Sequence, residues 1–493
     1  MVIACYLEKL GNQNRKKLRN QPEDSHNQFK FYLERIIRNK SRNHIPPMKN
    51  IFNTSHFSAF ISLCLPLITA SVTLITFLVY VADNPVEAKP NEQNNAERTS
   101  SNLAAVWNAR AVEISYAEDQ FFTFKGHRAL TMMHLAMHDV LNKINPQYEP
   151  YACSDRRSGA EPIAAASQAA YQILVSQYPD RQTLLENELK IWLDQIPEGE
   201  AKKAGISMGI VCADKILRLR EDDGWDTEGA YEFRDKTGDY ITTGSWDGYV
   251  HAPGFRSARP FVLKTHDQFR PLPPPALESR AYAKAFNEVK MYGEAKSRAR
   301  TEDQTGYAIW WMEFAEAAVN RLARQLAESQ KLDLQETARL FAYINVALYD
   351  TYIAVWDAKY EYNHWRPVTA ILRAEEDGNP DTAQDVDWKP LRPTAPFPDY
   401  PSAHAAACAA SFGVLEQIFG TDFQFEMETN TAPKDMPTRS FNSFDEAAKE
   451  CADSRIQLGW HFRYAADEGL ALGRSVKNFV LKNQLYSKSN IEY

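Results

Sequence analysis

The sequence predicts a mainly helical protein, all-α in class, and three observations lead to this prediction. Helical periodicity dominates from about Leu103 to the C-terminal end. No alternation of strands and helices supports a doubly wound parallel sheet, and no internal repeat of about 20–50 residues is apparent. The composition, with 44% hydrophobic and 24% charged residues in 493, excludes a disordered chain or a disulfide miniprotein.

The first 83 residues differ from the rest of the chain in charge and hydropathy. A basic arm over 1–50 carries eleven Lys and Arg against four Asp and Glu, and the stretch 51–83 has no charged residue before Asp83. That stretch is long enough to cross a bilayer once, and the positive-inside rule places the basic arm in the cytoplasm. We therefore expect a transmembrane anchor, with everything after Asp83 exported.

A cleaved signal peptide explains the same stretch equally well. It would start at Met48 and be cut near Val86-Glu87-Ala88, where small residues suit a signal peptidase. A buried core helix is a weaker explanation, because so long a charge-free stretch is unusual in a soluble domain. In either favoured case the body of the protein lies outside the cytoplasm, anchored to the membrane or released as a periplasmic or secreted protein.

After a polar linker at 84–102, the sequence predicts two helical halves, 103–300 and 301–485. An irregular excursion over 223–275, rich in Gly, Trp and Pro, interrupts the first half and is either a lid or a segment packed by its own aromatics. The expected helices are 129–144, 162–177, 181–195, 200–220, 279–292, 305–329 and 335–360.

Charge and cysteine usage narrow the class further. The whole chain has a net charge of −8 although its first 50 residues are basic, so the body is acidic. General nucleic-acid binders need clustered cations and are excluded. Export permits disulfides, but no cysteine spacing indicates them, and Cys408 and Cys451 are expected to be buried free thiols within helices.

Two motifs resemble catalytic signatures without the structural context that they require. Ser207 lies in a GxSxG sequence, but the pattern is helical on both sides, whereas a nucleophile elbow needs a preceding strand. His134 and His138 have the spacing of a zinc-binding helix, but Leu135 stands where such a helix has its catalytic Glu. We interpret Ser207 as an ordinary helix residue and both histidines as core residues.

Three segments in the last third of the chain combine fixed cations, histidines and a helix N-terminus. The first segment ends a long amphipathic helix, and the third is broken by Gly459. The second opens an Ala-rich helix, with Ser402 as the expected N-cap and free N–H groups in the first turn. Their polar residues are Lys359 and Arg366 in the first, Ser402, Ala403 and His404 in the second, and Arg455 and His461 in the third.

Each of these residues alone has an ordinary structural explanation, such as a helix cap or a satisfied core histidine. Together they supply three cations, a hydroxyl, backbone amides and two imidazoles. That inventory matches a tetrahedral oxyanion such as phosphate or vanadate, whose oxygens Arg binds in a bidentate manner. The sequence therefore predicts one oxyanion site.

The order and spacing of the segments, KxxxxxxRP, then PS(G)H, then SRxxxGxH, resemble the vanadium-dependent haloperoxidases. The type-2 phosphatidic acid phosphatases and bacterial acid phosphatases share the pattern. The resemblance covers roughly 106–482 and implies a helical-bundle domain of the haloperoxidase and acid-phosphatase kind.

The resemblance also implies a role for each residue. His461 would bond vanadium, or form a phosphohistidine in a phosphatase, and His404 would be the acid–base group beside the apical oxygen. Trp356 and Phe397 match positions that line the halide pocket, where Phe is typical of chloroperoxidases and His of bromoperoxidases, although core packing explains both equally well. The groups that would hold the equatorial oxygens are Lys359, Arg366, Ser402, Arg455 and the backbone N–H of Ala403.

Two positions depart from the family pattern. Ala403 replaces the usual Gly, which keeps the amide and matters only if the backbone needs a positive φ. The Asp that often lies four residues after the nucleophilic histidine is Ala465 here, and Asp467 cannot simply inherit its role. Which group orients His461 is left open.

The leading interpretation is an exported vanadate-dependent haloperoxidase-like enzyme with hydrogen peroxide, halide and an organic acceptor as small-molecule substrates. In it Lys359 would polarise the bound peroxide. The alternatives are a phosphomonoesterase that acts through a phosphohistidine and needs no vanadate, and a non-catalytic oxyanion-binding module. Two histidines placed for covalent and acid–base work argue against the binding module. The sequence does not reveal the preferred halide or the oligomeric state.

Overall fold

The computed structural model describes residues 99–487 apart from positions 120, 122, 155–158, 235, 245 and 247. The basic arm, the hydrophobic stretch and nearly all of the linker lie outside the described residues, and so do the predictions of a membrane anchor or signal peptide. Among the helices of the described part, none is long and apolar enough to cross a membrane.

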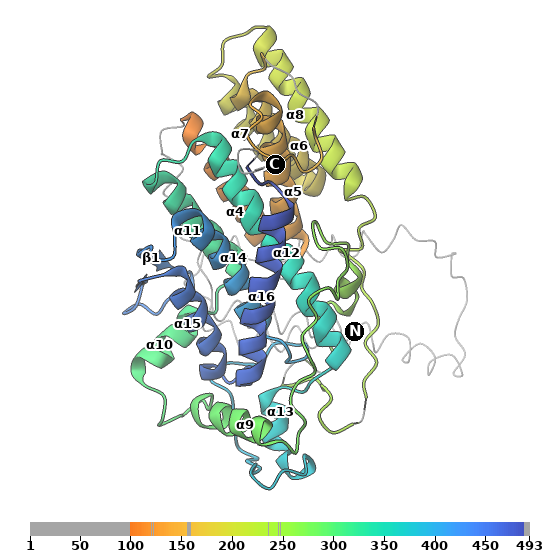
Figure 1. The fold of residues 1–493 in the computed structure, drawn as a ribbon, viewed down its shortest axis with the longest axis vertical. Coiled ribbons are helices and arrows are strands. Elements are labelled where there is room, and N and C mark those ends of the chain that lie inside the picture. The colour runs from red at the N-terminus through yellow and green to blue at the C-terminus, as the bar shows by residue number, and fades with distance from the viewer. Residues whose placement is uncertain are drawn as a thin grey trace, which may run out of the picture. The chain divides into compact units, whose positions relative to one another are not determined.

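The described part is mainly helical, which confirms the predicted class (Figure 1). A short antiparallel hairpin, in which Phe425 pairs with Phe441, was not expected; the inward side chains of its first strand join a cluster of phenylalanines. The elements are α4 (Leu103–Asp119), α5 (Lys125–Ile144), α6 (Pro162–Gln177), α7 (Gln182–Leu193), α8 (Glu200–Leu219), α9 (Arg280–Tyr292), α10 (Glu302–Trp310), α11 (Ala315–Ser329), α12 (Leu334–Tyr362), α13 (Pro367–Leu372), α14 (Ala403–Phe419), β1 (Phe425–Glu428), β2 (Thr438–Phe441), α15 (Phe444–Gln457) and α16 (Arg463–Asn483).

The expected helix 305–329 is wrong as a single element, because two helices, α10 and α11, occupy it. Thr429 and Thr431 both donate hydrogen bonds of 2.8 Å to the carbonyl of Trp310, and Arg455 donates one to the carbonyl of Trp311. These carbonyls are therefore taken by side chains from distant segments rather than by the next helical turn.

Two groups of helices pack in a similar way. In the first, α6 packs against α8 and α5; in the second, α14 packs against α16 and α12, and α5 contacts α12 between the groups (Figure 1). Gly205 and Gly209 of α8 lie against the backbone of α6, where a Cβ on Gly205 would stand 2.5 Å from the carbonyl oxygen of Glu161. Ser207, between these glycines, is exposed on α8, so its assignment as an ordinary helix residue is confirmed.

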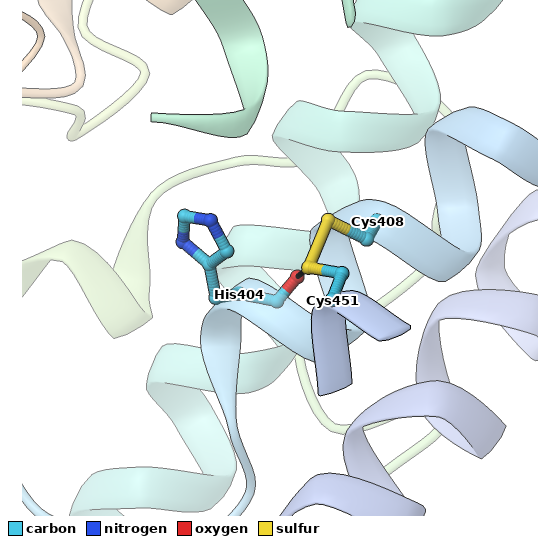
Figure 2. Close-up of side chains that lie close together, drawn as sticks. All are labelled: His404, Cys408 and Cys451. Carbon is cyan, nitrogen blue, oxygen red and sulfur yellow. Dashed lines mark hydrogen bonds between the residues drawn. A yellow bond between two sulfur atoms is a disulfide. The ribbon is translucent and has the colours of Figure 1, made fainter. Parts of the chain in front are cut away.

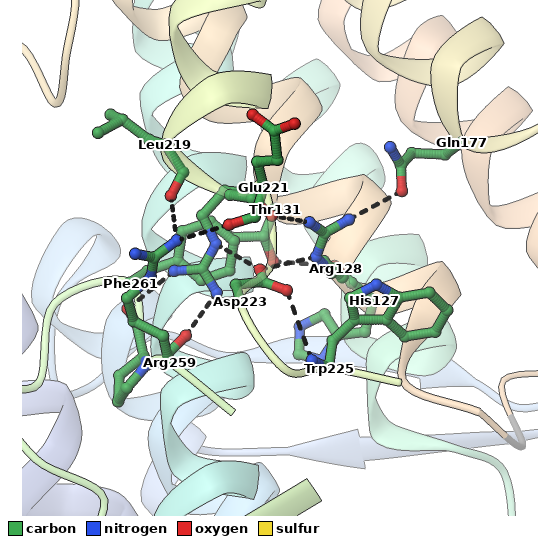
Figure 3. A network of polar contacts seen from close by, with 12 residues as sticks. His127, Arg128, Thr131, Gln177, Leu219, Glu221, Asp223, Trp225, Arg259 and Phe261 are labelled. Carbon is green, nitrogen blue, oxygen red and sulfur yellow. Dashed lines mark hydrogen bonds and ion pairs between the residues drawn. The ribbon is translucent and has the colours of Figure 1, made fainter. Parts of the chain in front are cut away.

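Among its described residues, the excursion over 223–275 contains no α-helix, and buried polar contacts fasten it to the helices. Arg128 of α5 and Arg220 both donate to Oδ2 of Asp223, at 2.8 and 2.7 Å (Figure 3). Asp350 of α12 accepts hydrogen bonds from the backbone amides of 261–263. Each buried carboxylate is thus matched by donors, which offsets its desolvation.

The prediction of free thiols at Cys408 and Cys451 is wrong, because the two residues form a disulfide. They come from neighbouring helices, α14 and α15, with Cα atoms 6.7 Å apart, inside the range that a disulfide can bridge. A second disulfide joins Cys153 to Cys212 of α8. Both pairs are distant in sequence, so only the packing of the helices brings the sulfur atoms together.

His134 and His138 are core residues of α5, as predicted. Burial lowers the pKa of His134 to about 3 and that of His138 to about 4, so both are neutral near pH 7. His134 lies 2.9 Å from the side-chain amide of Asn108, and His138 faces the carbonyl of Glu149. Each contact uses Nε2 of the ring, and Nδ1 of both histidines is buried without a hydrogen-bond partner in the described part of the chain.

Candidate active site

The residues of the predicted oxyanion site come from the ends of helices. Lys359 lies in the last turn of α12, which stops at Asn363 because that residue adopts a left-handed conformation with φ 49°. Arg366 caps α13 and is followed by Pro367 at the first helical position, where proline is favoured. The end of α12 and the start of α13 thus present both cations to the same loop.

The other two segments lie at the start of α14 and at the end of α15. Ser402 is the N-cap of α14, so Ala403 and His404 form its first turn. Arg455 lies near the end of α15, and Gly459 with φ +77° reverses the chain so that His461 follows in the turn before α16. The backbone N–H groups of Trp460 and His461 both point to the carbonyl of Arg455, which closes this turn.

His461 lies at the centre of these groups. Its pKa is lowered well below the ordinary value, first by burial and then by the nearby charges of Arg366, Lys359 and Arg455, with His404 also contributing. Nη1 of Arg366 lies 3.1 Å from Nε2 of the ring. The five titratable side chains therefore share one buried place, although more than a hundred residues of sequence separate the first from the last.

Lys359 and Arg366 are held by backbone carbonyls. Nζ of Lys359 donates to the carbonyl oxygens of Pro398 and Asp399 at 2.8 and 2.9 Å, and burial lowers its pKa well below the ordinary value. Arg366 donates from Nε to the carbonyl of Phe397 and from Nη1 to that of Trp460, each at 2.8 Å. Its Nη2 is buried and has no hydrogen-bond partner within the described part of the chain, so one donor remains for a bound anion.

His404 and Arg455 face the segment between α10 and α11. Arg455 donates from Nη2 to the carbonyl of Trp311 at 2.5 Å, and the backbone of Trp311 and Glu313 also faces the ring of His404. Burial and then the charge of Arg455 lower the pKa of His404 well below its usual value. Its Nε2 is shielded from solvent and, among the residues described, has no hydrogen-bond partner.

Ala403 fits the turn without strain. It is not among the residues with positive φ, and the preceding Ser402 has φ −71° and ψ 116°. The departure from the usual glycine therefore leaves the first turn of α14 intact. Ser402 is fully buried and its Oγ accepts a long hydrogen bond of 3.4 Å from the amide of Ala405, which leaves its hydroxyl proton available to an anion.

The balance of charge favours an anion at this place. Lys359, Arg366 and Arg455 are all fully or almost fully buried, and Asp399 is the carboxylate that faces the first two. Burying cations without a counter-charge is costly, and the N-terminus of α14 adds a positive dipole end. The free donor at Arg366 Nη2 fits a tetrahedral oxyanion, which presents several acceptor oxygens in different directions, and Nε2 of His404 is a second buried polar atom without a partner among the described residues.

The two aromatic residues assigned to a halide pocket lie beside the cations. The ring centroids of Trp356 and Phe397 are 5.2 Å apart, and the Phe397 ring lies 5.0 Å from Nζ of Lys359 and 4.8 Å from Cζ of Arg366. His251, from the excursion, completes this aromatic group at 6.0 and 6.1 Å from the two rings. Sequence reasoning missed His251, because nothing along the irregular excursion indicates which residue reaches the site.

A second residue that the sequence analysis did not identify is Asp399. Its Oδ1 lies 2.7 Å from Nδ1 of His461 and 3.8 Å from Nη1 of Arg366. Burial raises the pKa of Asp399 to about 7, against the opposing effects of Arg366 and Lys359. Asp399 lies inside the segment 396–404, so its position in the sequence could have indicated it. It was missed because an acidic residue in a proline-rich loop is most often a surface residue.

The disulfide between Cys408 and Cys451 lies directly behind His404 (Figure 2). Cys408 follows His404 by one turn of α14, and Cys451 precedes Arg455 by one turn of α15. The sulfur of Cys451 is 3.7 Å from the carbonyl oxygen of His404. Because both sulfurs are in the disulfide, this trio of side chains does not offer thiolates to a metal, and instead it ties together the two helices that carry His404 and Arg455.

Comparison with known proteins agrees with this geometry. Residues 339–487 match the family described as the VCPO second helical-bundle domain, a range that includes all the predicted oxyanion residues. The vanadium chloroperoxidase of Curvularia inaequalis is 27% identical in an alignment of 458 residues, which covers 69% of this chain and 74% of that protein.

Solved structures extend the similarity to both groups of helices. The first bacterial vanadium-dependent iodoperoxidase is 25% identical with a TM-score of 0.70, and the match covers 81% of this chain and 100% of that one. A holo-type bacterial vanadium-dependent chloroperoxidase shares the fold at 16% identity, with a TM-score of 0.60 over 80% of this chain and 96% of the other. In sequence and in fold, the chain is therefore similar to the vanadium-dependent haloperoxidases.

Proposed function

We propose that this protein is a vanadate-dependent haloperoxidase, which oxidises a halide ion with hydrogen peroxide. The observation that carries the proposal is the meeting of Lys359, Arg366, Arg455 and His404 around His461, with hydrogen-bond donors left unused. The small-molecule substrates are hydrogen peroxide and halide. Similarity to an iodoperoxidase and to chloroperoxidases supports this chemistry over phosphoester hydrolysis at the same residues.

The residues fit vanadate in number and type. His461 offers Nε2 as a ligand, and the oxygens would be held by the side chains and the amide of the predicted set, Lys359, Arg366, Ser402, Ala403 and Arg455. When bound, vanadate supplies a Lewis-acid centre that activates peroxide towards halide without a change of oxidation state. Three cations against one facing carboxylate leave a positive excess that suits such an anion.

His404 is placed for proton transfer. The overall reaction, halide plus hydrogen peroxide plus one proton giving hypohalous acid plus water, consumes a proton in each turnover. Because burial and Arg455 lower its pKa, the imidazole of His404 is neutral at rest and can accept a proton from peroxide through the unpaired Nε2 and return it to the departing oxygen. Two backbone carbonyls fix the amino group of Lys359, which would face the reacting oxygens.

The aromatic group of Trp356, Phe397 and His251 borders the cations and supports a role in admitting the halide. Aromatic edges and a neutral imidazole form a weakly hydrated surface next to Lys359, which suits a large, polarisable anion. His251 is neutral near pH 7, because burial lowers its pKa to about 4. The arrangement excludes water from the space beside the cations, which strengthens their electrostatic effect.

A paired assay tests the proposed function. Purified protein loaded with orthovanadate should oxidise halide in the presence of hydrogen peroxide, with iodide tried first because it is the halide most easily oxidised, then bromide and chloride. The second arm contains p-nitrophenyl phosphate without vanadate. His461→Ala should abolish the peroxidase activity, and Ser207→Ala, an exposed substitution on α8, is the matched control and should leave it unchanged. Hydrolysis of the phosphoester without any halide oxidation would establish a phosphatase instead.

We also propose that the protein is exported, through a membrane anchor or a cleaved signal peptide. Two disulfides within the described part support an oxidising compartment, since such bonds are rare in the cytosol. A C-terminal fusion to a reporter that is active only after export should be active. A fusion active only in the cytoplasm would contradict the proposal.

A further inference from the structure

His461 must present one ring nitrogen to the oxyanion, so its other nitrogen needs a partner. Within the described residues, Nδ1 faces Asp399, whose Oδ1 lies 2.7 Å away, although the angle falls short of a well-aligned hydrogen bond. Asp399 is fully buried. The position four residues after His461, where the family often has a carboxylate, is Ala465, so Asp399 reaches the imidazole from a different segment of the chain.

The contact between Arg366 and His461 indicates where the imidazole proton resides. Nη1 of Arg366 lies 3.1 Å from Nε2 and 3.5 Å from Nδ1, so its shorter contact is with Nε2, and a guanidinium can only donate hydrogen bonds. The shorter contact is satisfied when Nε2 carries no proton and accepts, and a neutral ring then carries its proton on Nδ1. That proton faces the carboxylate of Asp399. The 2.7 Å contact of Nδ1 with Asp399 and the shorter of the two Arg366 contacts thus favour the same tautomer.

Asp399 is itself held in place by the residues of the site. Its backbone N–H donates to the carbonyl of His364 at 2.9 Å, and its own carbonyl accepts from Nζ of Lys359 at 2.9 Å. Nη1 of Arg366 lies 3.8 Å from Oδ1. Both cations at the end of α12 and the start of α13 therefore fix the loop from which the carboxylate reaches His461.

We propose that Asp399 is the positioning residue of His461. It accepts the Nδ1 proton and so keeps the lone pair of Nε2 directed at the oxyanion, in the place of the carboxylate that is missing at 465. Groups that hold the second nitrogen of a ligating histidine fix its tautomer and ring orientation in this manner. The proposal rests on the proposed function for the identity of the anion, whereas the tautomer can be measured without it.

The first experiment measures that tautomer by NMR in full-length protein labelled with ring-¹⁵N histidine, where His461 is assigned by its loss in His461→Gln. The expected result is a proton on Nδ1 and none on Nε2. In Asp399→Asn, the amide oxygen is attracted to Arg366 and the amide NH₂ then donates to Nδ1, so the ring proton should move to Nε2. Affinity for orthophosphate and for orthovanadate, measured by calorimetry, should fall by about 10–100-fold.

Asp139→Asn is the matched control. Asp139 is another fully buried aspartate, which accepts three backbone hydrogen bonds beside α5, and the same change of charge there should alter neither the tautomer of His461 nor anion affinity. Thermal unfolding of both variants separates a loss of folding from a loss of positioning. If Asp399→Asn does not fold, the NMR spectrum of the unsubstituted protein still tests whether the proton of His461 is on Nδ1.

Two results would overturn the proposal: a proton on Nε2 of His461 in the unsubstituted protein, or unchanged tautomer and phosphate affinity in folded Asp399→Asn. Failure of the proposed function gives a different pattern. In that case the tautomer and its reversal are as expected, but the vanadate-loaded protein does not oxidise halide.

Discussion

The two groups of helices have the same packing at their centres, yet only one of them holds the oxyanion residues. Gly205 of α8 lies against the carbonyl of Glu161, and Gly469 of α16 lies against the carbonyl of Ser402; a Cβ on either glycine would stand 2.5 Å from that carbonyl oxygen. One turn later, Gly209 and Gly473 make the corresponding approach to α6 and α14. In both groups, the glycines of one helix thus allow it to pack closely against the first turn of an Ala-rich helix.

Supporting contacts are also repeated between the groups. Asp139 of α5 accepts hydrogen bonds from three successive backbone amides, at 151–153, and Asp350 of α12 does the same with those at 261–263. Each group also contains one disulfide. The shared features therefore serve packing, and they do not explain why only one helix N-terminus is proposed to bind an anion.

The difference lies in the first residues of α6 and α14. Glu161 caps α6 with its own carboxylate, which accepts from the amide of Ala164 at 2.5 Å, so this N-terminus already has a negative charge. Ser402 caps α14 with a neutral hydroxyl. Ile163 occupies the place in α6 that His404 has in α14. The N-terminus of α6 thus binds the carboxylate of its own cap residue, whereas the N-terminus of α14 is left available to an external oxyanion.

The largest effect is expected from exchanging the caps. Ser402→Glu would place a carboxylate where the oxyanion binds, and orthovanadate affinity and halide oxidation should fall below detection. The reciprocal Glu161→Ser should leave both unchanged and alter the free energy of unfolding by about 1 kcal/mol or less, since Ser is also a favourable cap. Calorimetric titration with vanadate and denaturant unfolding measure the two results. Retained vanadate binding in folded Ser402→Glu would contradict the idea that the cap residue decides which N-terminus is available to an anion.

Next in size is the loss of the proton-transfer group. His404→Ala should reduce turnover by about two to four orders of magnitude, the range for a missing acid–base group, while vanadate affinity is largely retained. Ile163→Ala, at the corresponding position of α6, should not change turnover. Steady-state rates with separately measured affinity distinguish the two parameters. Equal losses of affinity and rate in His404→Ala would mean that this histidine only holds the anion.

A smaller effect is expected for a single cation. Arg366→Ala removes the unpaired Nη2 donor and should weaken vanadate binding by about 1.5–3 kcal/mol, the range for a charge-assisted hydrogen bond. Arg128→Ala, which removes a buried arginine from the network around Asp223, is the control: it should lower stability but not anion affinity (Figure 3). An equal loss of affinity in both variants would show that the effect comes from general destabilisation.

The smallest functional difference separates the two disulfides. Replacing either pair with serines should lower the free energy of unfolding by about 2–4 kcal/mol. Only loss of the bond between Cys408 and Cys451 should also weaken vanadate binding, by a few-fold, because this bond ties the helices that carry His404 and Arg455 (Figure 2). The matched variant lacks Cys153 and Cys212. Identical vanadate affinity in the two variants would assign both bonds to stability alone.

Sequence reasoning was most successful where the signal is local. The helix predicted at 162–177 coincides with α6, and Ser402 is the N-cap of α14, because periodicity and cap chemistry act within a few residues of the chain. It failed for 305–329, since the carbonyls of Trp310 and Trp311 are bound by side chains far away in sequence. Whether a periodic stretch continues as one helix there depends on those distant partners.

The sequence by itself determined the helical class, the inventory of cations and histidines, and the family that this inventory resembles. Only the tertiary structure decided which groups face those residues: Asp399 at Nδ1 of His461, His251 beside Trp356, and the disulfide behind His404. The physical reason is that residue type and spacing specify local conformation and chemical capacity. A contact between distant segments depends instead on how whole helices pack, and here close glycine contacts and buried carboxylates set that packing.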